Sequence, residues 1–467
     1  MSEYEAFIEA KLATIPPRGL DAIPELHPSL FPFQRDLVSW ALRRGRAALM
    51  CDTGLGKTRQ QIEWARCVAE HIGPDAHIMI LAPLAVAAQT VAEGASIGVA
   101  VNLCRESTDV RPGLNITNYD RIHKFDASRF DGVVLDESSI IKHHDAKTLR
   151  TLLDAFSRTA FKLCCTATPA PNDWTELGTH AEFLGICSRT EMLSEYFVHD
   201  GGDTSVWRLK GHARAAFWKW VSTWGALVRR PSDLGYDDDA YSLPKLIVNQ
   251  HVIESDASAV AKRGLLFEVE AQDLMARRQA RSASIDGRVK ACADRVNSEP
   301  DEPWIVWCDL NRESEALRDA IPGSVEVRGS MSTDEKEAAL RGFADGSIRV
   351  LVTKSSIAGF GLNWQHCARM AFVGVTDSWE SYYQSVRRCW RFGQLRDVVV
   401  WLFSSAAEGA VIANLARKDR EAAKMADALS AETREIVRSE VRALRRESNA
   451  YLAHREIKIP EWLKSED

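Results

Sequence analysis

The feature that most constrains the fold is a glycine-rich turn between a short apolar run and a longer amphipathic run. Residues 47–51 are apolar and short enough for a buried strand, and residues 58–70 have the spacing of a helix. The turn between them is Asp52-Thr53-Gly54-Leu55-Gly56-Lys57. A strand, a glycine-rich turn and a helix in this order predict a loop whose backbone N–H groups face an anion at the helix N-terminus.

This loop has the residues that hold the phosphates of a nucleotide. The two glycines let the backbone approach the phosphates. Lys57 would neutralise the β- and γ-phosphates, and the Thr58 hydroxyl would hold Mg²⁺. Cys51 stands where the general pattern has its first glycine, so a turn that binds nothing is the alternative. The sequence predicts an ATP site formed by Cys51, Asp52, Thr53, Gly54, Leu55, Gly56, Lys57 and Thr58.

Two adjacent carboxylates follow the apolar run 132–135. Asp136, at the end of the predicted strand, can reach the Mg²⁺ shell together with Thr58, and Glu137 can orient and deprotonate an attacking water. Such pairs also occur on ordinary protein surfaces. Because a phosphate loop lies upstream, we predict that this pair completes a site for hydrolysis.

Length and composition limit the class of protein. A chain of 467 residues exceeds one hydrophobic core. We find no apolar run of about 18 residues and no secretory signal, which predicts a cytoplasmic protein without a membrane anchor. The net charge of -6 excludes a surface that is basic throughout, but not positive charge confined to a cleft. The ten cysteines lack metal-ligand spacing and are expected to be reduced and buried.

Short apolar runs alternate with amphipathic runs in two series, which predicts parallel sheets flanked by helices. The candidate strands are 47–51, 78–82, 99–103, 132–135 and 163–165, then 304–308, 325–327, 350–353, 371–373 and 398–403, with a helix over 334–343. We expect a leader at 1–30, a first domain with a Trp-rich helical extension at 31–235, a linker and helical segment at 236–297, a second domain at 298–406, and a solvated helical tail at 407–467.

The Trp-rich stretch 205–230 has two interpretations. Basic residues are interleaved with Trp207, Trp218, Trp220 and Trp224, and no acidic residue interrupts them. Such a surface could grip a nucleic-acid strand by phosphate contacts and stacking. The spacing of three or four residues is equally typical of a helix whose tryptophans form core.

Residues 384–394, which precede the last strand of the second series, closely match Q-x-x-x-R-x-x-R-[IF]-G-Q. Further motifs are Phe31-Pro32-Phe33-Gln34, Ala82-Pro83-Leu84, Ile116-Thr117-Asn118-Tyr119, Thr166-Ala167-Thr168-Pro169 and Ile357-Ala358-Gly359-Phe360-Gly361-Leu362-Asn363. With these motifs the chain resembles superfamily 2 helicases and translocases, and more closely their Swi/Snf-type branch, over nearly its whole length.

The resemblance implies two tandem RecA-like α/β domains with ATP in the cleft between them. Gln34 would read the adenine edge. From the second domain, Gln384, Arg388 and Arg391 would complete the catalytic site, and the two arginines would lie three apart on one helix face to stabilise the transition state. The residues implied for the remaining roles are Gly361 beside ATP, Thr166 and Thr168 for coupling, and Pro83, Thr117, Asn118, Gly359 and Asn363 for nucleic-acid contact.

Ser138-Ser139 differs from the Ala-His or Ala-Asp that usually follows the acidic pair in this family. Serine can donate a hydrogen bond but carries no charge. The sequence therefore does not show how this position would couple hydrolysis to nucleic-acid binding.

These motifs together predict a nucleic-acid-stimulated ATPase that uses ATP and Mg²⁺ and moves along nucleic acid, with double-stranded DNA favoured. Phage or bacterial proteins of replication, recombination or defence are the expected partners. One alternative is a helicase that separates strands of DNA or RNA. The other is a nucleotide-gated scaffold with little turnover.

Overall fold

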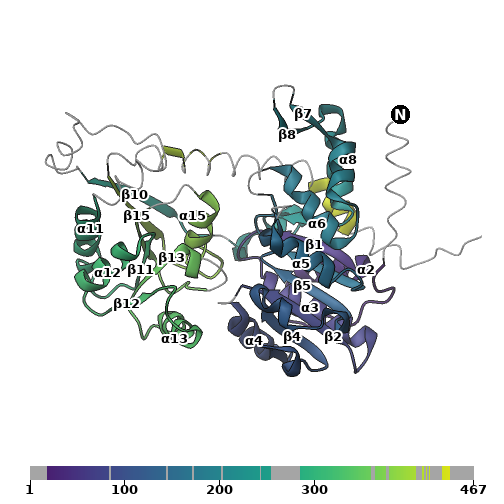
Figure 1. The fold of residues 1–467 in the computed structure, drawn as a ribbon, viewed down its shortest axis with the longest axis horizontal. Helices are drawn as coiled ribbons and strands as arrows, with labels where there is room; N and C mark the ends of the chain where they lie inside the picture. Colours follow the sequence, from purple (N-terminus) through teal and green to yellow (C-terminus); the bar gives the residue numbers. More distant parts are fainter. Residues whose placement is uncertain are drawn as a thin grey trace, which may run out of the picture.

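Two α/β domains lie side by side in the structure (Figure 1). The computed structural model describes residues 18–83, 86–142, 146–170, 173–200, 203–241, 243–253, 284–358, 363–374 and 378–405, and beyond these residues 413, 414, 417, 420 and 434–441.

The first domain is built on a seven-stranded, fully parallel sheet. From edge to edge the strands are β3 (Val101–Leu103), β4 (Gly113–Asn118), β2 (His77–Ala82), β5 (Gly132–Asp136), β6 (Phe161–Cys165), β1 (Arg46–Cys51) and β9 (Gly225–Val228). Most are short apolar runs buried on both faces, as parallel strands require. The sheet places the carboxyl ends of β1 and β5, where the phosphate loop and the acidic pair begin, at the same edge.

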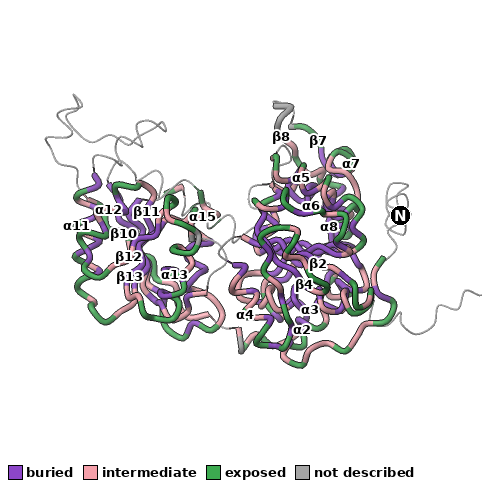
Figure 2. Tube along the Cα trace, turned by 60° about the horizontal axis from the view of Figure 1, so that its bottom comes forward, coloured by how far each residue is buried: buried purple, intermediate pink, exposed green. Residues whose placement is uncertain are grey.

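Helices cover both faces of this sheet. A hydrophobic core lies between the sheet and the helices of each face, and the two cores form the buried interior in Figure 2. On one face lie α2 (Pro32–Arg44), α3 (Lys57–Ile72) and α4 (Ala87–Ser96). On the other lie α5 (Lys147–Ala155), α6 (Leu177–Leu184), α7 (Arg189–Tyr196) and α8 (Arg214–Ser222). A hairpin of β7 (Phe197–Asp200) and β8 (Asp203–Leu209) projects beside α8.

The second domain has a six-stranded sheet, again fully parallel. Its order is β10 (Leu246–Ile253), β15 (Val398–Ser405), β14 (Arg369–Val373), β11 (Trp304–Cys308), β13 (Val350–Lys354) and β12 (Ser324–Val327). Its helices are α11 (Ile285–Asn297) and α12 (Asn311–Ala320) on one core, α13 (Thr333–Ala344) and α15 (Trp379–Val386) on the other, and the short α14 (Ser355–Ala358). The predicted fold class, two α/β domains with parallel sheets flanked by helices, is confirmed.

Parts of three segments that were predicted to lie outside the two domains pack within them. The predicted linker 236–297 contains β10 and α11, both part of the second domain, while its residues 254–283 lie outside the described chain. In the predicted leader, Leu20 and Leu30 are buried in the core of the first domain. In the predicted tail, Val437 and Val441 are buried in that same core. Local propensity identifies such helices and strands, but not the domain against which they pack.

The Trp-rich stretch belongs to the core of the first domain. Trp218, Trp220 and Trp224 are buried, and Trp220 packs against Tyr196 with ring centroids 5.4 Å apart. The structure therefore favours the core interpretation for these three tryptophans, while Trp207 is half-buried on β8. All ten cysteines are free thiols, and every one except Cys187 is buried.

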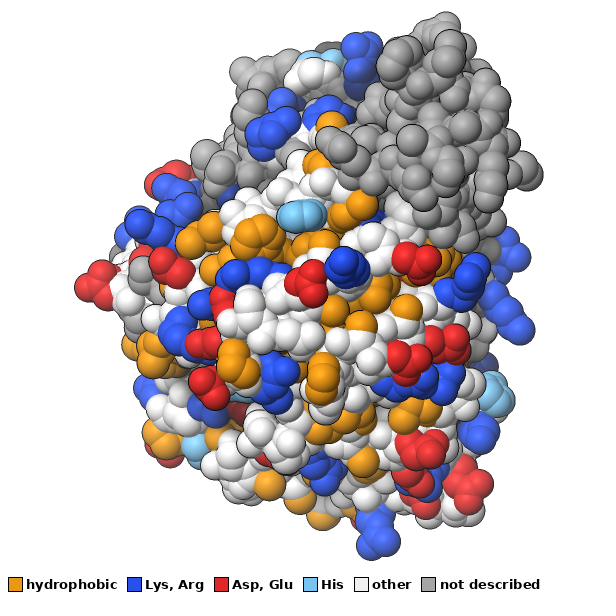
Figure 3. Space-filling model, turned by 90° about the vertical axis from the view of Figure 1, so that its left-hand side faces the viewer, with side chains coloured by type: hydrophobic (Ala, Val, Ile, Leu, Met, Phe, Trp, Pro, Cys, Tyr) orange, Lys and Arg blue, Asp and Glu red, His pale blue; other side chains and the backbone are white. Residues whose placement is uncertain are grey.

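The surface carries mixed charge. On the face in Figure 3, basic and acidic side chains lie next to one another, with hydrophobic side chains between them. Among the described residues, no helix combines the length and the apolar character needed to cross a membrane.

Candidate active site

The phosphate loop joins the end of β1 to the start of α3. Gly54 and Gly56 have φ angles of 95° and 74°, which a residue with a side chain adopts only at a cost. Lys57 Nζ donates to the carbonyl oxygens of Cys51 at 2.9 Å and of Asp52 at 3.3 Å. The ammonium group therefore lies inside the curve of the loop, while half-buried Thr58 lies in the first turn of α3. A loop with this geometry, opening at a helix N-terminus, suits phosphate oxygens.

Gln34 is fixed against this loop. Its Nε2 donates to the Leu55 carbonyl at 2.9 Å, and its Oε1 accepts from the Phe31 N–H at 2.9 Å. A Cβ atom added at Gly56 would lie 2.4 Å from Gln34 Nε2. Each end of the amide keeps one further hydrogen-bonding position, which is what recognition of an adenine edge requires.

The acidic pair lies beside the loop, with Asp136 buried and Glu137 half-buried. Asp136 Oδ1 accepts from Gln61 Nε2 of α3 at 2.6 Å. Burial raises the pKa of Asp136 to about 6, and Glu137 acts in the same direction, while the hydrogen bond from Gln61 and the charge of Lys57 oppose it. The site therefore concentrates negative charge that a cation can compensate.

Glu137 has an unusual backbone. Its φ of 51° is the only positive value among the described residues other than glycine. Its Oε2 atom is buried and has no hydrogen-bond partner within the described chain. A strained backbone and an unsatisfied carboxylate oxygen at the end of a sheet are features that functional sites retain.

The donor set fits Mg²⁺ better than a metal held by protein alone. Mg²⁺ prefers oxygen ligands and is usually bound by one or two carboxylates together with phosphates and water. The Thr58 hydroxyl in the first turn of α3 is such a ligand. The Asp136 carboxylate, on which the charge of Lys57 acts, is another. No group of three or more His, Cys, Asp or Glu side chains suited to a metal occurs among the residues that the structure describes.

The second domain presents its arginines to this site from the end of α15. The expectation that Arg388 and Arg391 share one helix face is wrong, because α15 ends at Val386 and the following residues form turns. Arg388 is buried and donates from Nε to the Gln384 carbonyl at 3.1 Å and from Nη2 to Gln384 Oε1 at 3.2 Å. Gln384 therefore orients Arg388.

Both arginines nevertheless interact electrostatically with Glu137, and Arg388 also with Asp136. Burial lowers the pKa of Arg388, and the negative charges of Glu137 and Asp136 oppose that shift. Burial and the neighbouring arginines lower the pKa of Arg391 to about 9, and Glu137 again opposes it. The structure thus brings Arg388 and Arg391 close to Asp136 and Glu137 of the first domain.

Several residues of the cluster were not predicted. Arg387 Nη2 donates to Asp52 Oδ1 at 3.1 Å and to the Thr53 carbonyl at 2.7 Å, and Tyr383 Oη donates to Asp52 Oδ1 at 3.0 Å. Arg387 occupies a position that the arginine motif leaves open, so the motif gave no signal for it. The sequence offered one hint, that a second arginine directly precedes the predicted catalytic Arg388.

The predicted coupling residues lie between the domains. The Thr168 N–H donates to Thr166 Oγ1 at 3.1 Å, and Thr168 Oγ1 donates to Glu380 Oε1 of α15 at 3.5 Å. Glu380 also forms an ion pair with Lys142 of the first domain. Thr166 and Thr168 are therefore placed where a movement of α15 would reach them.

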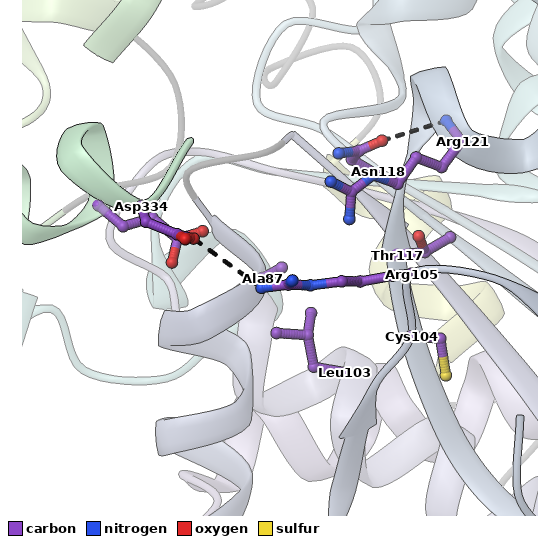
Figure 4. A pocket seen from close by; sticks show the side chains of 9 residues that line it. Ala87, Leu103, Cys104, Arg105, Thr117, Asn118, Arg121 and Asp334 are labelled. Atoms are coloured by element: carbon purple, nitrogen blue, oxygen red, sulfur yellow. Dashed lines mark hydrogen bonds and ion pairs between the residues drawn. The ribbon is translucent and has the colours of Figure 1, made fainter. Parts of the chain in front are cut away.

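Of the residues predicted to contact nucleic acid, two lie side by side at one cavity. Thr117 and Asn118 end β4 and line a cavity of about 280 Å³ (Figure 4). Across the cavity Arg105 extends toward Asp334 of α13, with 3.9 Å between Nη2 and Oδ1. Thr117 Oγ1 is buried without a hydrogen-bond partner in the described chain.

Pro83 and Asn363, two further residues predicted to contact nucleic acid, do not line this cavity. Pro83 follows β2, and its carbonyl accepts from the Val86 N–H at 2.9 Å. Asn363 is half-buried, with no partner for its Oδ1 among the described residues. Gly359, predicted to contact nucleic acid, and Gly361, predicted to lie beside ATP, are outside the described residues.

Comparison with known proteins identifies part of the second domain. Residues 287–393 match the family model of the helicase conserved C-terminal domain. The pre-mRNA-splicing ATP-dependent RNA helicase prp28 of Aspergillus clavatus is 31% identical over 144 residues, which are 30% of this chain and 18% of that protein. The SWI/SNF-related matrix-associated actin-dependent regulator of chromatin subfamily A-like protein 1 of Xenopus tropicalis is 29% identical over 167 residues, 33% of this chain and 17% of that protein.

One solved structure is similar over most of the chain. It is the Sulfolobus solfataricus SWI2/SNF2 ATPase core in complex with dsDNA, at 17% identity and a TM-score of 0.40, covering 91% of this chain and 98% of that one. The curated relatives, by contrast, are matched over less than a fifth of their own length. Residues 287–393 are therefore similar to the helicase conserved C-terminal domain, and the chain has both helicase and SWI/SNF-related relatives.

Proposed function

We propose that the chain is a nucleic-acid-stimulated ATPase that moves along double-stranded DNA, with ATP and Mg²⁺ bound between its domains. One observation carries the ATPase part: buried Arg388 and half-buried Arg391 of the second domain act on Glu137, which follows β5. Hydrolysis of ATP needs positive charge opposite a water-activating carboxylate, and this arrangement supplies both.

Each residue of the proposed site has a separate role in hydrolysis. Lys57 and the N–H groups of the loop bind phosphates, and Thr58 with Asp136 holds Mg²⁺. Bound Mg²⁺ supplies charge neutralisation at the phosphates. Glu137 has one free carboxylate oxygen with which to accept a proton from water. Arg388, oriented by Gln384, and Arg391 stabilise the charge that develops in the transition state.

Movement along DNA rests on the contacts between domains. Because Arg388 and Arg391 belong to one domain and Lys57 to the other, each cycle of binding and release shifts the domains relative to one another. The Thr168 to Glu380 contact couples that shift to the first domain. The preference for double-stranded DNA is supported by the Swi/Snf-type pattern of residues 384–394 and by the SWI/SNF-related relative.

The first test measures phosphate release with and without duplex DNA. We expect stimulation by DNA, loss of turnover in Lys57→Ala, and retained ATP without turnover in Glu137→Gln. Lys290→Ala, which removes an exposed lysine of α11, is the control and should match the wild type. A rate that no nucleic acid changes would contradict the motor, and an active Lys57→Ala would show that the site is misassigned.

The main alternative is a helicase that separates strands. It is favoured by the relative named as an ATP-dependent RNA helicase. Strand-displacement and triplex-displacement assays separate the two proposals, because a duplex translocase removes a third strand without unwinding the duplex. Unwinding without triplex displacement would support the alternative.

The cellular setting is a separate proposal. Residues 231–236 resemble a linker of small phage and prokaryotic members of the family, which supports cytoplasmic partners in phage or bacterial replication, recombination or defence. Isolation of the tagged chain from such a host, with identification of bound proteins, tests this. A nucleotide-gated scaffold would instead bind partners while turning over little ATP.

A further inference from the structure

The second domain contacts the phosphate loop directly at Asp52. Its Oδ1 accepts hydrogen bonds from Tyr383 Oη at 3.0 Å and from Arg387 Nη2 at 3.1 Å. The same Nη2 donates to the Thr53 carbonyl at 2.7 Å. The Arg387 side chain is 5% exposed and that of Asp52 21%. One guanidinium thus holds both a carboxylate and a backbone carbonyl of the other domain.

The guanidinium of Arg387 is itself held in place. Its central carbon lies 5.1 Å from the centroid of the Trp390 ring and 5.7 Å from that of Tyr383. Tyr383 in turn stacks on Trp379, with ring centroids 4.9 Å apart. Burying an arginine is unfavourable unless its charge is paired and its hydrogen bonds are made. Asp52 pairs the charge and the aromatic rings pack against the guanidinium, while Arg387 Nε has no hydrogen-bond partner within the described chain.

This contact extends into the catalytic cluster on both sides. In the first domain, the Asp52 carbonyl accepts from Lys57 Nζ at 3.3 Å. In the second domain, Arg387 precedes Arg388, and a Cβ atom added at Gly54 would lie 3.1 Å from Phe392. The segment that contains the predicted catalytic arginines therefore contacts residues 52–54 of the phosphate loop.

We propose that Arg387, supported by Tyr383, is a positioning residue that docks the second domain on Asp52 and thereby places Arg388 and Arg391 opposite Glu137. The proposal rests on the proposed ATPase function for its kinetic consequence, but the docking contact does not depend on it. Arg387 acts through its neighbours and needs no contact with ATP.

A double-mutant cycle measures this role. The variants are Asp52→Asn, Arg387→Gln and the double variant, with kcat and KM for ATP measured at saturating DNA. Arg387→Gln should lower kcat by about tenfold or more, because the catalytic arginines lose their fixed position, while KM changes less. The double variant should lose no more than the worse single variant, since both changes break one contact. Losses that multiply would overturn the proposal.

Two further variants test whether the loss of kcat comes from the contact with Asp52. Tyr383→Phe removes one hydroxyl and keeps the ring, so it should give a smaller loss of kcat and should fold even if Arg387→Gln does not. Arg396→Gln is the matched control, because Arg396 pairs with Glu302 of its own domain, at 2.9 Å, and should leave kcat unchanged. A wild-type kcat in both Tyr383→Phe and Arg387→Gln would overturn the proposal.

Small-angle X-ray scattering gives a readout that needs no catalysis. Without nucleotide, Arg387→Gln and Asp52→Asn should have a larger radius of gyration than the wild type and Arg396→Gln. Unchanged scattering would overturn docking by this pair. If the wild type hydrolyses no ATP but the scattering changes as expected, the docking contact stands and the proposed function fails.

Discussion

Ser138 Oγ lies 3.1 Å from His180 Nε2 in the buried interior behind the acidic pair. The other ring nitrogen, Nδ1, lies 3.5 Å from the Glu176 carbonyl. With the ring proton on Nδ1, the ring donates to this carbonyl and accepts from the Ser138 hydroxyl at Nε2. Because Ser138 follows Glu137, this bond fixes the turn that carries the unsatisfied carboxylate. A histidine from α6 thus supports the position at which the sequence departs from the family pattern.

The stability of the first domain should therefore depend on pH through His180. Burial lowers its pKa to about 4, and hydrogen bonds between the ring and the backbone of Glu176 and of Ser138 oppose this shift. Between pH 4 and 6.5 the unfolded state binds a proton that the folded state does not, so the free energy of unfolding falls as the pH falls through this window. The loss should reach about 3 kcal/mol. Thermal unfolding at pH 4.5 to 7.5 measures it.

His180→Asn is the comparison for this prediction. Asparagine keeps a polar group near Ser138 but does not titrate, so its unfolding temperature should depend less on pH. The raised pKa of Asp136 acts in the opposite direction, since it reduces stability as the pH rises toward 6. Both proteins contain Asp136, so their difference isolates His180. Parallel curves for the two proteins would contradict the prediction.

Gly54 and Gly113 offer a matched test of the contact between the phosphate loop and the second domain. Their φ angles are 95° and 97°, so alanine at either position should cost about 1 kcal/mol of stability. A Cβ atom at Gly54 would meet Phe392 at 3.1 Å, whereas at Gly113 nothing lies within 4 Å. Gly54→Ala should therefore lose most ATP hydrolysis and Gly113→Ala should keep it. Equal activity in two equally destabilised variants would count against the contact.

Much of the fold could be predicted because buried parallel strands are apolar and short. The strand 304–308 is observed with the predicted bounds. β4 was missed as a strand because it contains Asn115, a buried polar residue whose amide is satisfied by the backbone of Arg111 at 2.8 and 3.0 Å. A hydrophobicity pattern cannot identify a polar residue whose partners are backbone atoms of a loop.

The parts of the candidate site that the sequence predicts are formed by residues close together in the chain. The phosphate loop and the acidic pair each lie within a few consecutive residues, and the structure places them together. The helix expected for Arg388 and Arg391 is wrong because motif spacing does not show that α15 ends at Val386. The contact between Arg387 and Asp52 joins residues 335 positions apart, and no local pattern contains that information.

Arg121 should contribute to nucleic-acid binding at the cavity beside Thr117 and Asn118. It lines the cavity, and its N–H donates to Asn118 Oδ1 at 3.1 Å. Arg121→Glu should weaken binding of duplex DNA and reduce the slope of log K against log salt by about one, the effect of one lost phosphate contact. Arg129→Glu makes the same change of charge at an exposed site that does not line the cavity. Equal weakening by both variants would indicate a general charge effect.

The hydroxyl of Thr168 should link hydrolysis to nucleic-acid binding. It donates to Glu380 Oε1 at 3.5 Å, and Glu380 is held by Lys142, so the hydroxyl joins the first domain to α15. Thr168→Val keeps the shape of the side chain but removes the donor, whereas Thr168→Ser keeps the donor. We expect the ratio of DNA-stimulated to unstimulated ATPase to fall toward one in the valine variant and to persist in the serine variant. The reverse order would show that shape, rather than the hydrogen bond to Glu380, carries the coupling.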